Sequence, residues 1–255
     1  VGSEMCIRDS PLRMMRAARF VSRLDVDPSA DLVAAMTDMA ERIRIISAER
    51  VRDELIKLIN GDNPRRGVEL LVSTGLADSV LPEIPALKLE TDAQHHHKDV
   101  YEHSLTVLMQ AKDLETDDGP VPAPDFTLRF AALMHDVGKP ATRKLDGTGA
   151  VSFRHHDVVG AKLVKKRMRA LRFDNETIKN VARLVELHMR FYGYGEAGWT
   201  DSAVRRYVRD AGEQLERLHR LTRSDVTTRN KKKAQRLAHA CLLYTSPSPR
   251  DRQKS

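Results

Sequence analysis

The chain of 255 residues contains few cysteines, few aromatic residues and no long apolar segment. Two cysteines are too few for a disulfide-stapled scaffold. No window approaches the roughly 18 consecutive apolar residues of a membrane-spanning helix, and the N-terminus lacks the basic start and apolar run of a signal peptide. With 41% apolar and 31% charged residues, the composition is typical of a globular protein with a buried core. We therefore expect a soluble, cytoplasmic protein with no membrane partner.

The net charge of the chain is positive. Lys and Arg number 43 against 36 Asp and Glu, which gives a formal charge of +7 and a pI near 9.5. Such a balance suggests a polyanionic partner, although a basic surface by itself more often means only good solvation. The distribution of the charges has to decide between the two.

Both cysteines lie in terminal segments without helical periodicity, 1–10 (VGSEMCIRDS) and 241–255 (CLLYTSPSPRDRQKS). These segments resemble translated sequencing adapters, so we expect them to be non-native flanks and exclude them from the fold. The interior, 11–240, has no cysteine. Any metal there must be held by His, Asp or Glu.

Nearly every periodic segment has the spacing of an α-helix, so the predicted fold class is all-α. Proline and polar residues at 81–93 mark a boundary between two helical groups. Residues 140–154 indicate a loop, in which 142–153 can form a short hairpin. The expected helices cover 11–24, 28–39, 47–60, 63–75, 100–114, 125–136, 156–171, 174–189, 200–209 and 213–225.

Several of the expected helices turn a polar side chain toward the core. Ile178, Val181 and Val185 step by three and four, and the next residue on this apolar stripe is His188. A buried ionisable group is costly unless it is paired or binds a metal. One inward histidine is more often a hydrogen-bonded core residue, but convergence of several favours a shared metal. The other positions of this kind are His103, His135, His156 and Asp225.

The adjacent pair His135 and Asp136 adds a geometric constraint. Neighbours on a continuing helix do not face the same way. The helix must therefore end at this pair, and Gly138 and Pro140 supply the ending. Both side chains can then approach one ion.

These residues resemble the pattern of the HD superfamily of metal-dependent phosphohydrolases: a His, then His-Asp, then a distant Asp. The strings YEHSL, AALMHDVGKP, HHDVVGAK and LVELHMR fit it over about residues 97–229. The resemblance implies one or two divalent ions, which polarise a phosphoryl oxygen and lower the pKa of bound water toward ~7. Ligand type alone leaves Mg, Mn, Fe, Co, Ni and Zn open. The implied metal ligands are His103, His135, Asp136, His156, His188 and Asp225.

The resemblance also implies catalytic roles for His135, Asp136 and Lys139. Lys139 can hold the phosphate, and the alternative is an ordinary solvated lysine at a helix end. The run His95, His96 and His97 offers secondary ligand candidates, although a polar run beside a proline-rich boundary is more often an exposed loop.

The N-terminal segments PLRMMRAARFVSRL and SAERVRDEL resemble the neck of bacterial tRNA nucleotidyltransferases, the CCA-adding enzymes and their poly(A) polymerase relatives. In that family a Glu-Asp-x-x-Arg motif reads the incoming CTP or ATP. Only Arg13 of the motif is present here, because Asp9 and Ser10 of the flank stand in the first two positions. The resemblance implies nucleotide binding by Arg13 and Arg16. Without it, the segments are a basic amphipathic helix and a capped helix.

The polymerase head of that family, with its paired metal-binding aspartates, is not in this sequence, so the chain as written should not add nucleotides. We therefore expect a neck at 11–92 that binds nucleotide and tRNA, an HD domain at 93–229, and the start of a basic tail at 230–240.

Basic residues cluster in two segments, which favours an RNA partner over a merely solvated face. Contacts to phosphates would position tRNA without reading its sequence. The candidates for RNA binding are Lys162, Lys165, Lys166, Arg167, Arg169, Arg172, Lys231, Lys232 and Lys233.

The leading hypothesis is thus part of a tRNA nucleotidyltransferase that matures and repairs tRNA 3′ ends, with ATP and CTP as substrates of the whole enzyme. Two alternatives stay open. One is a free-standing HD phosphohydrolase acting on a nucleotide or a 2′,3′-cyclic phosphate. The other is a non-catalytic RNA-binding module.

Overall fold

The computed structural model describes residues 9–88, 99–117, 120–145, 147, 151–190 and 200–226. Within these ranges nearly all regular structure is helical, which confirms the all-α prediction. None of the helices in these ranges is long and apolar enough to cross a membrane. The cysteines, His95, His96, His97, Lys231, Lys232 and Lys233 lie outside the described residues.

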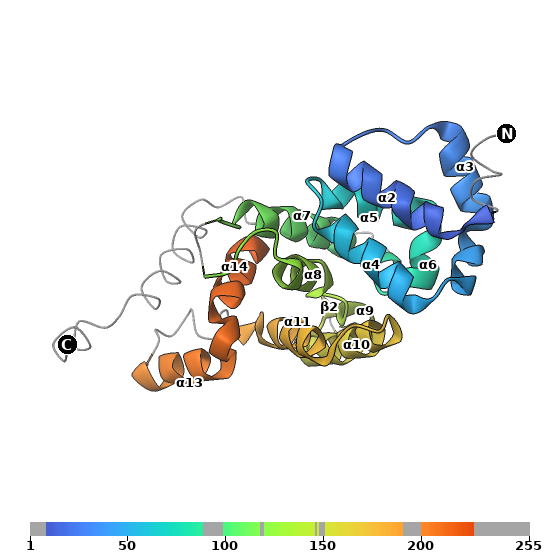
Figure 1. Cartoon of the computed structure of the whole chain (residues 1–255). Helices are drawn as coiled ribbons and strands as arrows, with labels where there is room; N and C mark the ends of the chain where they lie inside the picture. Colours follow the sequence, from blue (N-terminus) through green and yellow to red (C-terminus); the bar gives the residue numbers. More distant parts are fainter. Residues whose placement is uncertain are drawn as a thin grey trace.

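The N-terminal cluster consists of the helices up to residue 88 (Figure 1). The hydroxyl of Ser29 accepts a hydrogen bond from the Leu32 amide and so starts α3, while Pro64 occupies the first turn of α5. Gly75 adopts a left-handed φ of 74° between two helices. The elements are α2 (Leu12–Leu24), α3 (Ala30–Met39), η1 (Ala40–Ile45), α4 (Ala48–Ile59), α5 (Pro64–Ser73), α6 (Leu76–Val80) and η2 (Pro85–Leu87).

The C-terminal cluster consists of the elements from residue 99 onward. Side-chain oxygens of Asp99, Asp125, Asp174 and Thr200 accept backbone amides and start α7, α8, α11 and α13. The elements are α7 (Val100–Asp113), α8 (Phe126–Met134), α9 (Lys139–Thr142), β1 (Lys144–Leu145), β2 (Val151–Ser152), α10 (His156–Ala170), α11 (Asn175–Leu187), α13 (Asp201–Ala211), η3 (Gly212–Gln214) and α14 (Leu215–Asp225).

The expected helices omit η1, α6 and η2, and two further segments can be compared with the expectation. The helix expected at 213–225 begins as the short 3-10 turn η3, because Gly212 takes a φ of 53° and separates it from α13. The loop expected at 140–154 contains the end of α9 and the antiparallel pair β1–β2, in which Lys144 pairs with Ser152. The short hairpin is therefore confirmed.

Helix α8 lies at the centre of the C-terminal cluster, and its Phe130 is fully buried. It also ties the two clusters together. The guanidinium of Arg129 donates to the carbonyls of Ile59 (3.1 Å) and Gly61 (2.8 Å) at the end of α4. The same group is ion-paired with Glu115 at 2.6 Å. Since Arg129 is buried, this clamp fixes the C-terminal cluster against the N-terminal one.

Candidate metal centre

Six side chains from the ends and inner faces of five helices converge in the C-terminal cluster. His135 and Asp136 follow α8, His188 follows α11, His156 is the first residue of α10, and Asp225 is the last of α14. His103 comes from α7. They form two groups, His103 with His135 and Asp225, and Asp136 with His156 and His188. In each group the potential ligand atoms all lie within 4.8 Å of one another.

The carboxylate of Asp136 lies between the two groups. Its Oδ2 is 3.2 Å from Nε2 of His135 and 3.8 Å from Nε2 of His103. Its Oδ1 is 3.3 Å from Nε2 of His156 and 4.0 Å from Nε2 of His188. Asp136 therefore presents one oxygen to each group.

The second carboxylate, Asp225, belongs to the first group. Its Oδ1 lies 2.9 Å from Nε2 of His103 and 3.5 Å from Nε2 of His135. Nε2 of His156 and Nε2 of His188 approach each other to 3.3 Å in the second group. The nitrogens that face the centre are thus all Nε2 atoms.

Backbone carbonyls orient three of the imidazoles in the same way. Nδ1 of His135 lies 2.8 Å from the Ala132 carbonyl, and Nδ1 of His188 lies 2.7 Å from the Val185 carbonyl. Nδ1 of His156 is 2.8 Å from the Phe153 carbonyl. A proton donated from Nδ1 leaves the Nε2 lone pair directed inward, which is the arrangement that metal-binding histidines use. The carbonyls of Ala132 and Val185 are available because the last turn of a helix leaves its carbonyls unpaired.

Burial and nearby charges strongly shift the pKa values of the residues in the centre. Although burial by itself lowers the pKa of His135, the carboxylates of Asp136 and Asp225 raise it to about 10. Burial lowers the pKa of His188 to about 4, and the charge of His135 adds to this shift. Burial alone would raise the pKa of Asp136 and of Asp225, but the surrounding histidines hold both well below the usual range.

One atom of the centre has no hydrogen bond. Nε2 of His135 is buried and has no hydrogen-bond partner among the described residues, although two carboxylates lie nearby. A buried polar atom of this kind normally has a partner. A divalent cation would satisfy it, because imidazole nitrogens and two carboxylates surround one small volume. The donor set present therefore fits a metal.

The turn after the His-Asp pair explains how both reach the centre. Helix α8 ends at Met134, two residues before the end expected at Asp136, and His135 forms its C-cap. A Cβ atom added to Gly138 would lie 2.0 Å from the carbonyl oxygen of His156. Only glycine allows this turn to lie directly against the start of α10.

Lys139 also reaches the centre. Its Nζ lies 2.6 Å from Oδ2 of Asp136 and 5.7 Å from the centre of the Phe153 ring, and its side chain is 22% exposed. The amine is therefore both held by a carboxylate of the centre and open to solvent.

Arg13 and Arg16 lie away from this centre, in the N-terminal cluster. They line a hollow of about 490 Å³ between α2 and the segment that leads into α3, together with Phe20, Val26 and Leu32. A lining of apolar side chains and two arginines has the composition of a small-molecule site.

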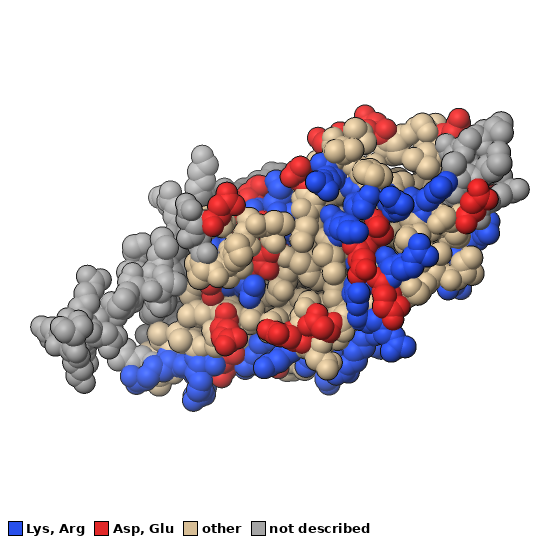
Figure 2. Space-filling view, viewed as in Figure 1, with Lys and Arg blue, Asp and Glu red and all other residues tan. Residues whose placement is uncertain are grey.

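The basic residues of α10 have different surroundings. Lys162, Lys166 and Arg169 are exposed. Arg167 differs, because its Nε donates to both carboxylate oxygens of Glu83, at 3.0 and 2.9 Å, and joins the two clusters. Arg172 is exposed at the end of α10 with a left-handed φ of 59°. Figure 2 shows Lys and Arg side chains along the edge where Figure 1 draws α10, α11 and α13.

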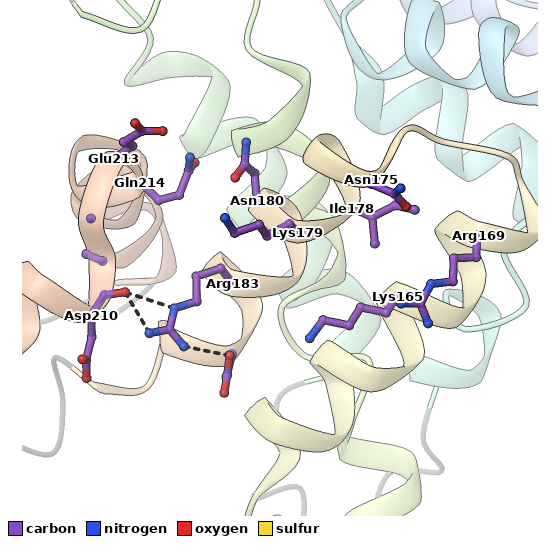
Figure 3. Close-up of a pocket in the computed structure, with 13 residues that line it drawn as sticks. Lys165, Arg169, Asn175, Ile178, Lys179, Asn180, Arg183, Asp210, Glu213 and Gln214 are labelled. Atoms are coloured by element: carbon purple, nitrogen blue, oxygen red, sulfur yellow. Dashed lines mark hydrogen bonds and ion pairs between the residues drawn. The ribbon is translucent and has the colours of Figure 1, made fainter.

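Sequence reasoning missed a second hollow, of about 750 Å³, between α10, α11 and η3 (Figure 3). Residues of α11 that it did not select, among them Lys179, Asn180 and Arg183, line this hollow beside Lys165 and Arg169. Polar residues on an outward helix face carry no sequence signal of what lies opposite them.

Comparison with known proteins gives two family matches. Residues 25–87 match the family described as the probable RNA and SrmB-binding site of polymerase A, and residues 100–230 match the HD domain. The A-adding tRNA nucleotidyltransferase of Deinococcus radiodurans is 36% identical over 229 residues, which cover 88% of this chain and 50% of the relative.

Other relatives carry similar names. The CC-adding tRNA nucleotidyltransferase of Thermus thermophilus is 37% identical over 142 residues, 55% of this chain and 31% of the relative. The multifunctional CCA protein of Neisseria gonorrhoeae is 29% identical over 194 residues, 74% of this chain and 44% of the relative. The chain thus spans half or less of the length of these relatives. The RNA-binding match precedes the HD match, which is the order that the sequence predicts, and the relatives that cover both regions are named tRNA nucleotidyltransferases. Because the HD match alone covers just over half of the sequence, the chain belongs to the HD domain family.

Proposed function

We propose that the chain is the neck and HD domain of a tRNA nucleotidyltransferase that matures and repairs tRNA 3′ ends. The neck comprises 11–92 and the HD domain 93–229, with 230–240 as the start of a basic tail and 1–10 and 241–255 as non-native flanks. tRNA, ATP and CTP are then the substrates of the whole enzyme. The order of the two family matches and the names of the relatives support this assignment.

For the nucleotide, we propose that Arg13 and Arg16 form part of its site. Both arginines line the hollow of about 490 Å³, as does Phe20. Guanidinium groups bind phosphate and base edges with directed hydrogen bonds, and an aromatic side chain can stack on a base. The combination supports a nucleotide at this position.

For the HD domain, we propose metal-dependent hydrolysis of phosphoesters, with a 2′,3′-cyclic phosphate as the preferred test substrate. The observation that carries this proposal is the convergence of four inward imidazoles and two carboxylates in two adjacent groups. His103, His135 and Asp225 would hold one divalent ion, and Asp136, His156 and His188 a second. Asp136 can serve both, since it directs one oxygen to each group.

A divalent ion held there polarises a phosphoryl oxygen and acidifies the attacking water. The chain's own residues do the rest. The carbonyl contacts of Ala132, Phe153 and Val185 keep the imidazoles in the ligating tautomer. Lys139 places a positive charge beside Asp136 at the open side of the centre, where it can bind a phosphate oxygen.

The donor set also bears on the identity of the metal. Four of the six donors are imidazole nitrogens, and Mg prefers oxygen ligands. We propose that Mn, Fe, Co, Ni or Zn binds the HD centre more tightly than Mg does.

Metal content and turnover of the full chain test the proposal. We expect bound Mn or Ni and hydrolysis of 2′,3′-cyclic AMP, and loss of both in His135→Ala/Asp136→Ala. His155→Asn is the matched control. His155 is exposed next to His156, and asparagine tolerates its φ of 62°. Metal binding without turnover on any phosphoester would refute the hydrolase and favour the non-catalytic RNA-binding module.

A further inference from the structure

The hollow between α10, α11 and η3 has basic residues on one side and acidic residues on the other, and none of its lining residues belongs to the metal centre. Figure 3 shows Lys165 and Arg169 on one side, and Asp210, Glu213 and Gln214 on the other. Its volume of about 750 Å³ is within the range of ligand sites.

Three cations that line the hollow are available for a ligand. The described part of the chain offers no hydrogen-bond or ion-pair partner to Lys165, Arg169 or Lys179. Lys179 and Arg169 are exposed, and Lys165 is half-buried. The amide of Asn180, the next residue on α11 and also part of the lining, adds a donor and an acceptor.

The acidic groups on the other side are mostly neutralised. Arg183 donates to the carbonyl of Asp210, at 3.0 and 2.8 Å, and to the carboxylate of Glu186 at 3.0 Å. The carboxylate of Asp210 is paired with Arg190 at 2.8 Å. Glu213 is left as the one lining acid without a partner among the described residues. The hollow therefore presents an excess of positive charge, held on two packed helices.

We propose that this hollow binds the phosphodiester backbone of single-stranded RNA, with Lys165, Arg169 and Lys179 on the phosphates and Asn180 and Gln214 near the sugars and bases. Lysine and arginine without protein partners are the groups that contact nucleic-acid phosphates. Hydroxyl and amino groups of nucleotides can donate to the side-chain oxygen of Gln214 on the opposite side. The inference rests on the proposed RNA partner, and adds Lys179 on α11 to the cations of α10.

Binding of a fluorescent single-stranded RNA oligonucleotide, followed by anisotropy in a salt series, tests this site. We expect Lys165→Gln/Lys179→Gln to raise Kd about tenfold, and to reduce the slope of log K against log salt by about 1.4, since each contact to single-stranded RNA contributes ~0.7. The control Arg205→Gln/Arg206→Gln removes the same charge from the exposed surface of α13 and should change Kd less than about twofold.

A second variant acts in the opposite direction. Glu213→Gln removes the acid that faces the cations and should tighten RNA binding about threefold, by removing a like-charge repulsion with phosphate. An unchanged urea-unfolding midpoint of this variant separates the loss of the charge from a change in the fold.

Three outcomes would overturn the proposal, and they are distinguishable. If Lys165→Gln/Lys179→Gln and the control weaken RNA binding equally, the hollow is not the binding site, although RNA is still a partner. If the unmodified chain does not bind RNA, both the RNA partner and the proposed site are refuted. The metal centre is unaffected by this result, because the metal and turnover measurements test it separately. Binding of AMP that depends on Lys165 and Lys179, without binding of RNA, would assign the hollow to a free nucleotide instead.

Discussion

Replacement of Gly138 by alanine should separate the two halves of the metal centre. The added Cβ would lie 2.0 Å from the carbonyl oxygen of His156 and 2.7 Å from the amide nitrogen of Gly160. Both are backbone atoms of α10, which cannot rotate away as a flexible side chain can. To open the first contact to 3.0 Å, the turn after Asp136 and the start of α10 have to move apart by about 1 Å.

A movement of that size matters because Asp136 is next to the turn and His156 begins the helix. Their atoms Oδ1 and Nε2 are 3.3 Å apart. Metal–ligand distances tolerate only about ±0.2 Å, and the overpacking itself costs about 1–3 kcal/mol of unfolding free energy. We expect Gly138→Ala to unfold at lower urea and to bind Mn about 10–100-fold more weakly, as losses of ligand support do.

Two glycines provide graded controls. A Cβ at Gly147 meets no atom of the described residues within 4 Å, and one at Gly160 meets its nearest neighbour at 3.3 Å. Urea unfolding and Mn titration should therefore rank the variants with Gly147→Ala unchanged, Gly160→Ala mildly affected and Gly138→Ala most affected. Equal Mn affinity in the variants at 138 and 147 would refute the packing argument.

Three further changes have defined outcomes. Lys139→Met should lower turnover of 2′,3′-cyclic AMP about tenfold or more without loss of bound metal, because the phosphate loses its cation while a bound metal still neutralises Asp136; equal loss of metal would contradict this role. Arg129→Met should lower the free energy of unfolding by about 3–5 kcal/mol in urea titration, because it leaves Glu115 buried and unpaired; a change below 1 kcal/mol would contradict the clamp. In EDTA, the stability of the metal-free protein should peak near pH 6.5. The pKa of His188 is lowered to about 4 by folding, so the free energy of unfolding falls as the pH drops below 6.5 and the unfolded chain takes up a proton. The pKa of His135 is raised to about 10 by folding, so the free energy of unfolding also falls as the pH rises from 6.5 toward 10. A steady rise in stability to pH 9 would contradict these shifts.

Five of the six residues of the candidate metal centre could be selected from helical periodicity, and Asp136 from its place beside His135. The stripe of Ile178, Val181 and Val185 leads to His188, and Gly138 marks the end of α8 that His135 and Asp136 require. Periodicity states which face of a helix is buried. For this reason the inward-facing residues and the all-α fold class can be predicted from the sequence alone.

The grouping of these residues was not accessible, because periodicity does not say which helix lies opposite a given face. The pairing of His103 with Asp225 spans 122 positions, and the place of Asp136 between two groups depends on the turn geometry. Arg167 shows the same limit. The sequence predicts an RNA contact for Arg167 because its neighbours are basic, yet Glu83, 84 positions away, accepts its hydrogen bonds.

The most direct test of the account is an anomalous difference map from a crystal of the full chain grown with Mn, recorded at the Mn absorption edge. The account predicts peaks between His135, Asp136 and the other four ligands, with bonds of about 2.0–2.3 Å, and none in His135→Ala/Asp136→Ala. A fully occupied Mn at a different place, with the space between these side chains filled only by protein hydrogen bonds, would contradict it.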